Sequence, residues 1–406
     1  MARYTQHFNV RETPQSLPIP GSSQVENSAG GYSFAVDDWT RLDRFLVLGN
    51  EGGSYYASER KMTIENAEAV LRCIQTDGAR VVARVMEISE AGRAPKNDPA
   101  LFVLAMCAGL GTHPTKQAAY VALPRVARIG THLLHFAEFC VGFRGWGRGL
   151  RRAVAAWYLR QDPADLAYQV VKYQQRDKWA QRDLLRLSHP HAQTDLQKLI
   201  FEWVCRGMTK LPALETLPNE LAAIRGYELA QAATEKQLPA IVRTYSLPLE
   251  ALPSDKRSKE VWEALFPHLG MTALIRNLGN LSKVGVLMKG QWGAIESVVA
   301  RLTDVEQLRR ARIHPIAVLA ALHTYGQGHG VRGKGEWEVV PEVIDALDRA
   351  FYLAFQAVEP TGKRIVLALD VSGSMNAGSI AGIPGLTPRI GSAAMAMITY
   401  RTEKQV

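Results

Sequence analysis

The chain has 406 residues, of which 47% are hydrophobic and 21% are charged, a balance that excludes a chain disordered throughout. At about 100–200 residues per domain, the length allows two or three domains or one large repeat array. Lys and Arg outnumber Asp and Glu by 48 to 39, and the net charge of +9 favours a polyanionic partner. The four cysteines form no CxxC pair, so neither a zinc ribbon nor a redox dithiol is indicated. No signal peptide and no bilayer-length apolar stretch is recognisable, so we expect a cytoplasmic protein without a membrane partner.

The first 35 residues are rich in Pro, Gly, Ser and Gln, which predicts an extended N-terminal arm. From residue 36 to residue 360 nearly every segment has the period of a helix. The clearest predicted helices are Glu65–Ile74, Ala79–Ile88, Pro99–Leu110, Arg125–Cys140, Gly147–Arg160, Ala164–Arg176, Leu196–Gly207, Ser258–Leu269, Ile313–Tyr325 and Pro341–Phe355. Short connections between many helices indicate a mainly α fold, an α-solenoid. No exact repeat is visible, so the repeats must be degenerate.

The sequence changes character over residues 361–406. The apolar run Arg364–Leu369 predicts a buried parallel strand, and Ile390–Tyr400 predicts a helix. Together they form the first strand–loop–helix of an α/β domain. The loop carries Asp370, Ser372 and Ser374, a carboxylate and two hydroxyls at alternating positions. Such oxygens at the carboxyl end of a strand suit a divalent cation, Mg²⁺ above all.

The positive charge is concentrated between Val141 and Pro190. Ten basic and only four acidic residues in this segment give +6 of the total of +9. Most of the ten are Arg, whose planar fork suits phosphate. The interleaved aromatic residues are Trp146, Trp157, Tyr158, Tyr168, Tyr173 and Trp179. The pattern predicts a nucleic-acid surface, and the alternative is a solvated helix face with core aromatics.

Two features of this segment suit RNA. Lys172 and Arg176 are four residues apart on the predicted helix Ala164–Arg176, which would present both cations together. The next predicted helix carries Arg182 and Arg186 and ends at His189, whose imidazole can stack on a base or donate a hydrogen bond. The glycine-dense stretch from residue 142 to residue 149 is either a phosphate-approaching backbone or a flexible connection.

No arrangement of residues argues for catalysis, because the sequence contains no nucleophile elbow, no HExxH motif and no paired His or Cys ligands. A nuclease would need clustered carboxylates for two metals, and the basic segment offers none. The open alternative to RNA binding is a helical-repeat protein-interaction scaffold with a metal-dependent adhesion-type site (MIDAS).

Several motifs are spread in order along the chain. They are Arg44-Phe45-Leu46 with Glu51-Gly52-Gly53-x-Tyr55-Tyr56, Thr115–Tyr120, Trp146-Gly147-Arg148-x-Leu150-Arg151, Lys172-Tyr173-x-Gln175-Arg176, Asp183–His189, Arg276-Asn277-Leu278-Gly279, Ala311–Pro315, His329-Gly330-x-Arg332-Gly333-Lys334 and Glu359–Arg364. In these motifs the chain resembles the Ro (SS-A) autoantigen family, RNA-binding proteins built on the TROVE module. The N-terminal arm and the glycine-rich stretch are more like a bacterial member than an animal one.

The resemblance implies a closed ring of HEAT-like repeats followed by a von Willebrand factor A domain with its MIDAS. The domains would then be 1–35, the arm; 36–360, the TROVE ring; and 361–406, the start of the A domain. The resemblance also implies a ribonucleoprotein in which the protein binds small non-coding Y RNA on a basic outer surface. In RNA quality control, the central hole would take single-stranded 3′ ends of defective or misfolded RNA. An exoribonuclease such as polynucleotide phosphorylase is a further implied partner, and a ring closed within one chain suits a monomer.

The family's principal Y RNA contacts fall on Lys172, Arg176 and His189. The full set of predicted RNA-binding residues is Lys172, Arg176, His189, Arg186, Arg182, Arg144, Arg148, Arg151, Arg152 and Lys116. The resemblance places the metal ligands at Asp370, Ser372 and Ser374.

The chain departs from the family at its C-terminal end. An A domain has ordinary domain size, roughly 150 residues, whereas this chain ends at Val406. The family's downstream Thr and Asp metal ligands have no counterpart here, which puts metal binding by this chain in doubt. We expect either a fragment or a tail that packs on the ring without its domain.

Overall fold

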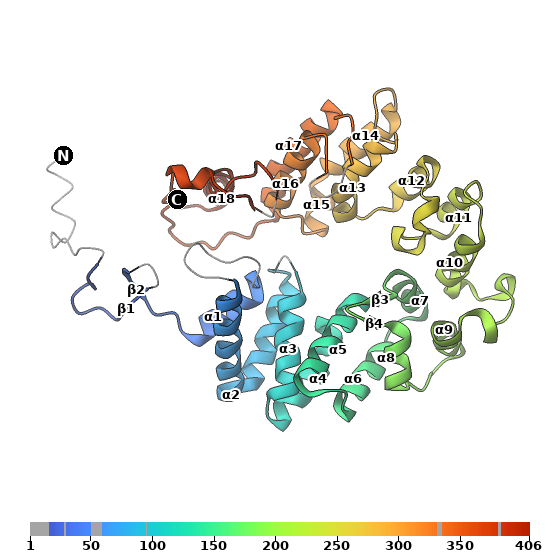
Figure 1. Ribbon diagram of the computed structural model, residues 1–406, viewed down its shortest axis with the longest axis horizontal. Helices are drawn as coiled ribbons and strands as arrows, with labels where there is room; N and C mark the ends of the chain where they lie inside the picture. The colour runs from blue at the N-terminus through green and yellow to red at the C-terminus, as the bar shows by residue number, and fades with distance from the viewer. Residues whose placement is uncertain (1–15, 28–29, 50–58, 95, 331–334, 381–382) are drawn as a thin grey trace. The chain divides into compact units, whose positions relative to one another are not determined.

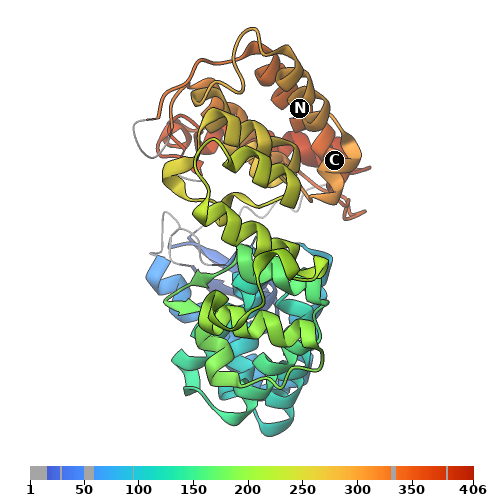
Figure 2. The ribbon, with the colours of Figure 1, turned by 90° about the vertical axis from the view of Figure 1, so that its right-hand side faces the viewer.

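The computed structural model describes residues 16–27, 30–49, 59–94, 96–330, 335–380 and 383–406. These residues form two compact units, Met1–Pro212 and Ala213–Val406 (Figures 1 and 2). Residues 1–15 of the predicted arm lie outside the described residues, as do residues 51–56 and 332–334 of the family motifs. No described helix combines the length and apolar character needed to cross a membrane.

The first unit is almost entirely helical. A short antiparallel hairpin precedes the helices, with β1 (Gln24–Glu26) paired to β2 (Tyr32–Phe34). The helices are α1 (Asp38–Leu48), α2 (Glu59–Ala91), α3 (Asp98–Leu110), α4 (His113–Val126), α5 (Gly130–Arg144), α6 (Arg148–Leu159), α7 (Pro163–Lys172), α8 (Gln181–Ser188) and α9 (Asp195–Arg206). A second hairpin, β3 (Gln175–Arg176) with β4 (Trp179–Ala180), lies between α7 and α8, and the 3-10 helix η2 (Gly207–Lys210) follows α9.

Helices of the first unit pack on the helix two places along the chain. In one row α3 packs on α5 and α7 packs on α9, and in the other α4 packs on α6 and α6 on α8. Two rows of alternating helices are what a stacked helical repeat produces. The prediction of a mainly α-helical chain is confirmed.

The interior of this unit is formed by large side chains from α3, α5 and α6. Leu101, Phe136, Trp157 and Tyr158 are fully buried. The two buried polar aromatics have partners, as burial requires: the Trp157 Nε1–H donates to the Ala127 carbonyl at 2.6 Å, and the Tyr158 hydroxyl donates to Gln181 at 2.5 Å. The sequence leaves open whether the interleaved aromatic residues belong to a nucleic-acid surface or to the core. Trp157 and Tyr158 belong to the core.

One predicted break between helices is confirmed, and one predicted helix start is wrong. The predicted helices Glu65–Ile74 and Ala79–Ile88 lie within α2, which breaks at Asp77, where φ is −155° and the side chain accepts from the Arg80 amide at 3.0 Å. The predicted helix Arg125–Cys140 is wrong at its start, because the chain leaves α4 after Val126 and begins α5 at Gly130. The bend exposes the Ala127 carbonyl to the Trp157 indole, a contact that periodicity alone does not reveal.

The second unit is also helical and contains many 3-10 turns. Its elements are η3 (Leu214–Thr216), η4 (Asn219–Leu221), α10 (Ala222–Ala232), α11 (Leu238–Tyr245), η5 (Leu249–Ala251), η6 (Ser254–Lys256), α12 (Lys259–Leu265), η7 (Phe266–His268), α13 (Met271–Lys283), α14 (Trp292–Leu302), α15 (Val305–Arg310), α16 (Pro315–Gly326), α17 (Pro341–Leu353), η8 (Ala354–Ala357), η9 (Gly373–Asn376) and α18 (Pro388–Thr402). Within it α10, α11 and α12 pack in succession, and α16 packs against α13, α17 and α18.

The predicted C-terminal strand Arg364–Leu369 is wrong. Among the described residues only Arg364 pairs, in a single parallel bridge to Gln405, and the rest of the run has no regular structure. Val366 is 93% exposed, whereas a parallel strand is buried by neighbours on both edges and helices on both faces. The described residues of this unit supply no such sheet. The predicted helix Ile390–Tyr400 is confirmed as α18.

Candidate nucleic-acid interface

Helix α7 presents Lys172 at its last turn. The helix begins at Pro163, where the Asp162 side chain accepts from the Ala164 amide at 2.9 Å, and it buries Leu166 and Val170 as predicted. The Lys172 Nζ lies 5.5 Å from the ring centre of Tyr168 and 5.4 Å from that of Tyr173. Because a cation over an aromatic face is attracted to it, these rings hold the ammonium at the end of the helix.

Arg176 lies on the β3–β4 hairpin and not on α7, so the predicted helix Ala164–Arg176 is too long. Helix α7 ends at Lys172, and Arg176 pairs with Trp179 across the hairpin. The two turn residues, Asp177 and Lys178, have φ of 49° and 67°. Both are non-glycine residues in the left-handed region, which costs energy unless the surroundings fix them. The Arg176 side chain is exposed, with its Nε 4.0 Å from Asp177 Oδ1.

Helix α5 supplies the contacts that fix this hairpin. The buried His135 contacts the Asp177 carboxylate through Nδ1, and its Nε2 lies 3.8 Å from Asp98 of α3. One turn later Glu138 accepts from the Trp179 indole N–H at 2.7 Å. Trp146 stacks on Trp179 with ring centres 5.7 Å apart. The hairpin that carries Arg176 is therefore held by side chains from a different part of the chain.

Helix α8 carries Arg182 and Arg186, both exposed, over a buried face that includes Leu184 and Leu185. Its first turn is held by Asp183, which accepts from the Ala180 amide at 2.9 Å. His189 ends the helix in the left-handed conformation, with φ of 47° and ψ of 57°, and its side chain is exposed. The Arg186 guanidinium donates to the Cys205 carbonyl at 3.3 Å, at the last turn of α9. This contact ties α8 to the C-terminal end of α9, where the helix dipole favours a cation.

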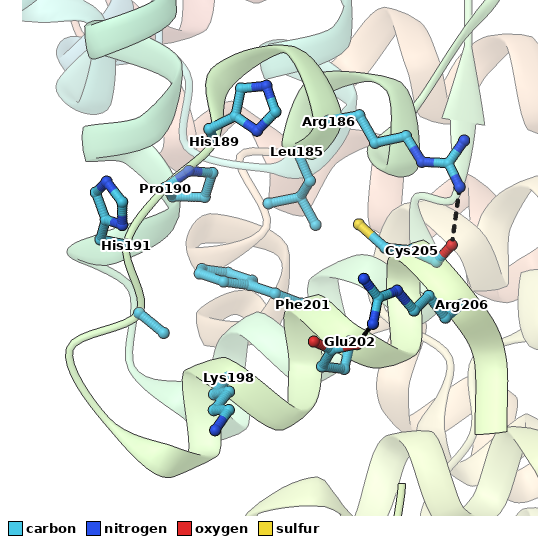
Figure 3. Close-up of a pocket in the computed structure, with 11 residues that line it drawn as sticks. Leu185, Arg186, His189, Pro190, His191, Lys198, Phe201, Glu202, Cys205 and Arg206 are labelled. Atoms are coloured by element: carbon cyan, nitrogen blue, oxygen red, sulfur yellow. Dashed lines mark hydrogen bonds and ion pairs between the residues drawn. The ribbon is translucent and has the colours of Figure 1, made fainter. Parts of the chain in front are cut away.

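A pocket of about 640 Å³ lies between the end of α8 and helix α9 (Figure 3). Its lining residues are Leu185, Arg186, His189, Pro190, His191, Ala192, Lys198, Phe201, Glu202, Cys205 and Arg206. Two predicted RNA-binding residues, Arg186 and His189, therefore face one cavity. Burial raises the pKa of the Cys205 thiol, so the group stays protonated at neutral pH and is no nucleophile.

The arginines around the α5–α6 connection lie at or near helix ends. Arg144 is the last residue of α5, Arg148 is the first of α6, and both are exposed, as are Arg151 and Arg152 one turn later. The Arg151 Nε–H donates to the Ser188 carbonyl at 3.3 Å, next to His189. This hydrogen bond places the first turns of α6 beside the C-terminal end of α8.

The glycine-rich stretch is a short, folded connection. Gly145 has φ of +79° and ends α5, and Gly147 caps α6. At Gly149 a Cβ atom would come within 2.5 Å of the Tyr120 ring, so close helix packing requires that glycine. The positive φ of Gly145 and the close packing at Gly149 explain two of its glycines without a ligand.

Lys116, the remaining predicted RNA-binding residue, lies on α4 and is half-buried. Helix α4 packs on α6, which carries Arg151 and Arg152. No contact joins Lys116 to the α8–α9 pocket within the described part of the chain.

The predicted metal residues share one exposed turn. The Asp370 carboxylate accepts from the Ser372 amide at 2.8 Å, and the Ser372 and Ser374 hydroxyls are 2.9 Å apart. These hydrogen bonds from Ser372 lower the pKa of Asp370. The oxygens are of the type that Mg²⁺ takes, but they include one carboxylate, and no described group of three His, Cys, Asp or Glu residues could hold a metal ion.

Sequence reasoning missed the α9 side of the pocket. Lys198, Phe201, Glu202 and Cys205 recur at spacings of three and four residues, which places them on one face of a helix. That spacing was visible in the predicted helix Leu196–Gly207, but a search by charge alone stops at Pro190. The charge pattern likewise gives no sign that Lys178 is a turn residue beside Arg176.

The TROVE domain family model matches residues 25–237 and 248–325. Over 400 residues the chain is 45% identical to the RNA-binding protein RO60 of Deinococcus radiodurans, covering 98% of this chain and 74% of that relative. The RNA-binding protein RO60 of Caenorhabditis elegans is 34% identical over 472 residues, 98% of this chain and 73% of the relative. The crystal structure of the Deinococcus radiodurans RO (RSR) protein is similar with a TM-score of 0.78 and 45% identity, covering 91% of this chain and 74% of that one. The relatives' names state RNA binding, which agrees with the prediction that the chain is not an enzyme.

Proposed function

The chain belongs to the family of TROVE-domain proteins that includes the RNA-binding protein RO60, and from this premise we propose that it binds RNA through the α7–α9 segment (Pro163–Arg206). The observation that carries the proposal is the α7–hairpin–α8 arrangement. Lys172, Arg176 and Arg186 lie there on three consecutive elements, and each is held by an aromatic ring, a fixed turn or a backbone carbonyl. Cations held in place suit the phosphates of a folded RNA.

We propose Y RNA as the ligand of this surface, with His189 beside the cations at the exit of α8. The position of His189 supports the proposal, because its imidazole is exposed on the rim of a pocket that Arg186 also lines. An exposed imidazole can stack on an unpaired base or donate to it.

The rest of the family resemblance forms a second, separate proposal. In it the helical units close into a ring, and single-stranded 3′ ends of defective RNA enter its central hole for RNA quality control. A monomer and an exoribonuclease partner such as polynucleotide phosphorylase belong to the same proposal. Its support is the family membership and the stacked helical repeat of the first unit.

The test is fluorescence anisotropy with a stem-loop RNA, with and without a single-stranded 3′ tail, from about 50 to about 300 mM salt. The Lys172→Ala/Arg176→Ala variant should bind the stem-loop more weakly, and its salt slope should fall by up to about two. A charge-matched control, Lys236→Ala/Lys289→Ala, removes two exposed lysines of the second unit and should leave the slope unchanged.

Each outcome separates the proposals. An unchanged slope in the Lys172→Ala/Arg176→Ala variant contradicts the role of these residues as phosphate contacts. Tail-dependent binding that survives in this variant supports a separate site for 3′ ends. Absence of any binding by the unchanged protein, with its helical content intact, contradicts RNA binding by this chain.

A further inference from the structure

The α8–α9 pocket has an aromatic floor. Phe201 of α9 is half-buried, and its ring packs on Tyr158 in a T-shaped arrangement, with ring centres 6.1 Å apart and planes at 83°. Figure 3 shows the Phe201 ring in the middle of the pocket, with Leu185 and Pro190 on the side of α8. This floor is apolar and planar, and it suits a flat aromatic group.

The rim of the same pocket is basic. Arg186, Lys198 and Arg206 surround the opening with one carboxylate, Glu202, which pairs with Arg206 at 3.2 Å. Three cations and one carboxylate leave a formal charge of +2. Lys198, Glu202 and Arg206 follow at four-residue spacing, so they form one line along α9.

Three rim side chains have no protein partner to satisfy them. Within the part of the chain that the structure describes, Lys198, His189 and His191 make no side-chain hydrogen bond or ion pair. Lys198 and the two histidines therefore line a cavity of about 640 Å³, a volume typical of small-molecule sites. The donors suit a phosphate, and the floor suits a base.

The charge distinguishes a terminal nucleotide from an internal one. An internal phosphodiester carries one negative charge, whereas a terminal phosphate carries roughly two at neutral pH, like other phosphomonoesters. The +2 of the rim therefore attracts the terminal group more strongly than an internal phosphodiester. A paired base is also stacked within its helix, so only an unpaired nucleotide can lay its base on Phe201.

We propose that the α8–α9 pocket binds a nucleoside 5′-phosphate, the unpaired 5′-terminal nucleotide of a bound RNA. Its base stacks on Phe201, and its phosphate lies at the rim that Lys198 and the two imidazoles line. The inference rests on the proposed RNA binding and deepens it, because it adds recognition of the phosphorylated end beside the surface that holds the stem.

The experiment compares two stem-loop RNAs that differ only at an unpaired 5′-terminal adenosine, which carries a phosphate in one and a hydroxyl in the other. The full chain should bind the phosphorylated RNA about tenfold more tightly, as expected for charge-assisted hydrogen bonds to a phosphate. Lys198→Ala and Phe201→Leu should each reduce this ratio to about two. Leucine keeps an apolar side chain against Tyr158, and the control Lys236→Ala removes one exposed lysine elsewhere and should keep the ratio.

Free AMP distinguishes the two sources of a nucleoside 5′-phosphate. AMP at millimolar concentration should abolish the preference for the phosphorylated RNA without displacing the hydroxyl RNA. A ratio of one in the unchanged protein overturns the inference while RNA binding stands, and so does a ratio that survives both variants. If neither RNA binds, the proposed function fails, and calorimetry with AMP alone then tests whether the pocket binds a nucleoside phosphate. Binding heat that Lys198→Ala removes supports such a site. Absence of binding heat overturns it.

Discussion

The α7–α9 segment and the C-terminal segment (Arg364–Val406) were both recognisable from sequence patterns, and the structure treats them differently. In the α7–α9 segment the neighbouring elements support the pattern: α5, from outside the segment, fixes the hairpin, and the end of α9 holds Arg186 of α8. In the C-terminal segment the run predicted to be a strand forms a single β-bridge, and Val366 is exposed to solvent. A pattern of residue types shows which chemistry is possible. Contacts from neighbouring elements determine whether those side chains are held in a defined arrangement.

The largest expected effect is on the free energy of unfolding, and it is measured by truncating one leucine in each segment. Leu184 of α8 is fully buried, so Leu184→Ala should lower the free energy of unfolding by about 2–5 kcal/mol. Leu369 of the predicted strand is 49% exposed, so Leu369→Ala should change it by less than about 0.5 kcal/mol. Urea denaturation of the full chain, followed by circular dichroism, measures both. A cost of several kcal/mol for Leu369→Ala would show that this segment is packed in solution and would remove the contrast.

A smaller effect concerns the support of the hairpin. His135→Phe keeps an aromatic ring beside Phe139 but loses the contact to Asp177, so Arg176 should be held less firmly. We expect RNA affinity to fall about threefold, a fraction of the loss from removing a charge-assisted contact. The control His113→Phe alters an exposed histidine of α4 and should have no effect.

A double-mutant cycle shows whether His135 acts through Arg176. In the His135→Phe background, Arg176→Ala should cost less affinity than it does in the unchanged protein, because the contact has already been weakened. Equal costs in both backgrounds would mean that the two residues act independently.

The smallest expected effect concerns metal binding. We propose that Asp370, Ser372 and Ser374 hold Mg²⁺ weakly, since a single carboxylate leaves most of its coordination to water. At a Mg²⁺ concentration equal to its dissociation constant the gain in stability should be about 0.4 kcal/mol. Asp370→Asn should abolish this gain in thermal unfolding and leave RNA affinity unchanged. Stabilisation by several kcal/mol would contradict a site made of these three residues.

The sequence was sufficient for helices whose apolar faces are buried by their neighbours. Leu166 and Val170 predicted the buried face of α7, and the cluster of cations predicted Arg186 and His189 as neighbours of one surface. The end of α7 could not be predicted in the same way. It depends on a turn that His135 and Glu138 hold from about forty residues earlier in the chain.

The two remaining errors have one physical origin. A strand requires partner strands, and the apolar run Arg364–Leu369 contains no information about whether they are present. The pocket likewise requires two helices, and each contributes only part of its lining. Phe201 and Lys198 become noticeable only when α9 is placed against the end of α8.

The alternating packing of helices in the first unit also bears on how the chain folds. The hydrogen bonds that join its elements link residues 19 to 41 positions apart, such as Arg186 with Cys205 and Trp179 with Glu138. Contacts so local in sequence require little loop closure and favour rapid folding. Most newly synthesised helices can therefore dock on the one made two before them, so this half of the protein can be assembled progressively during translation.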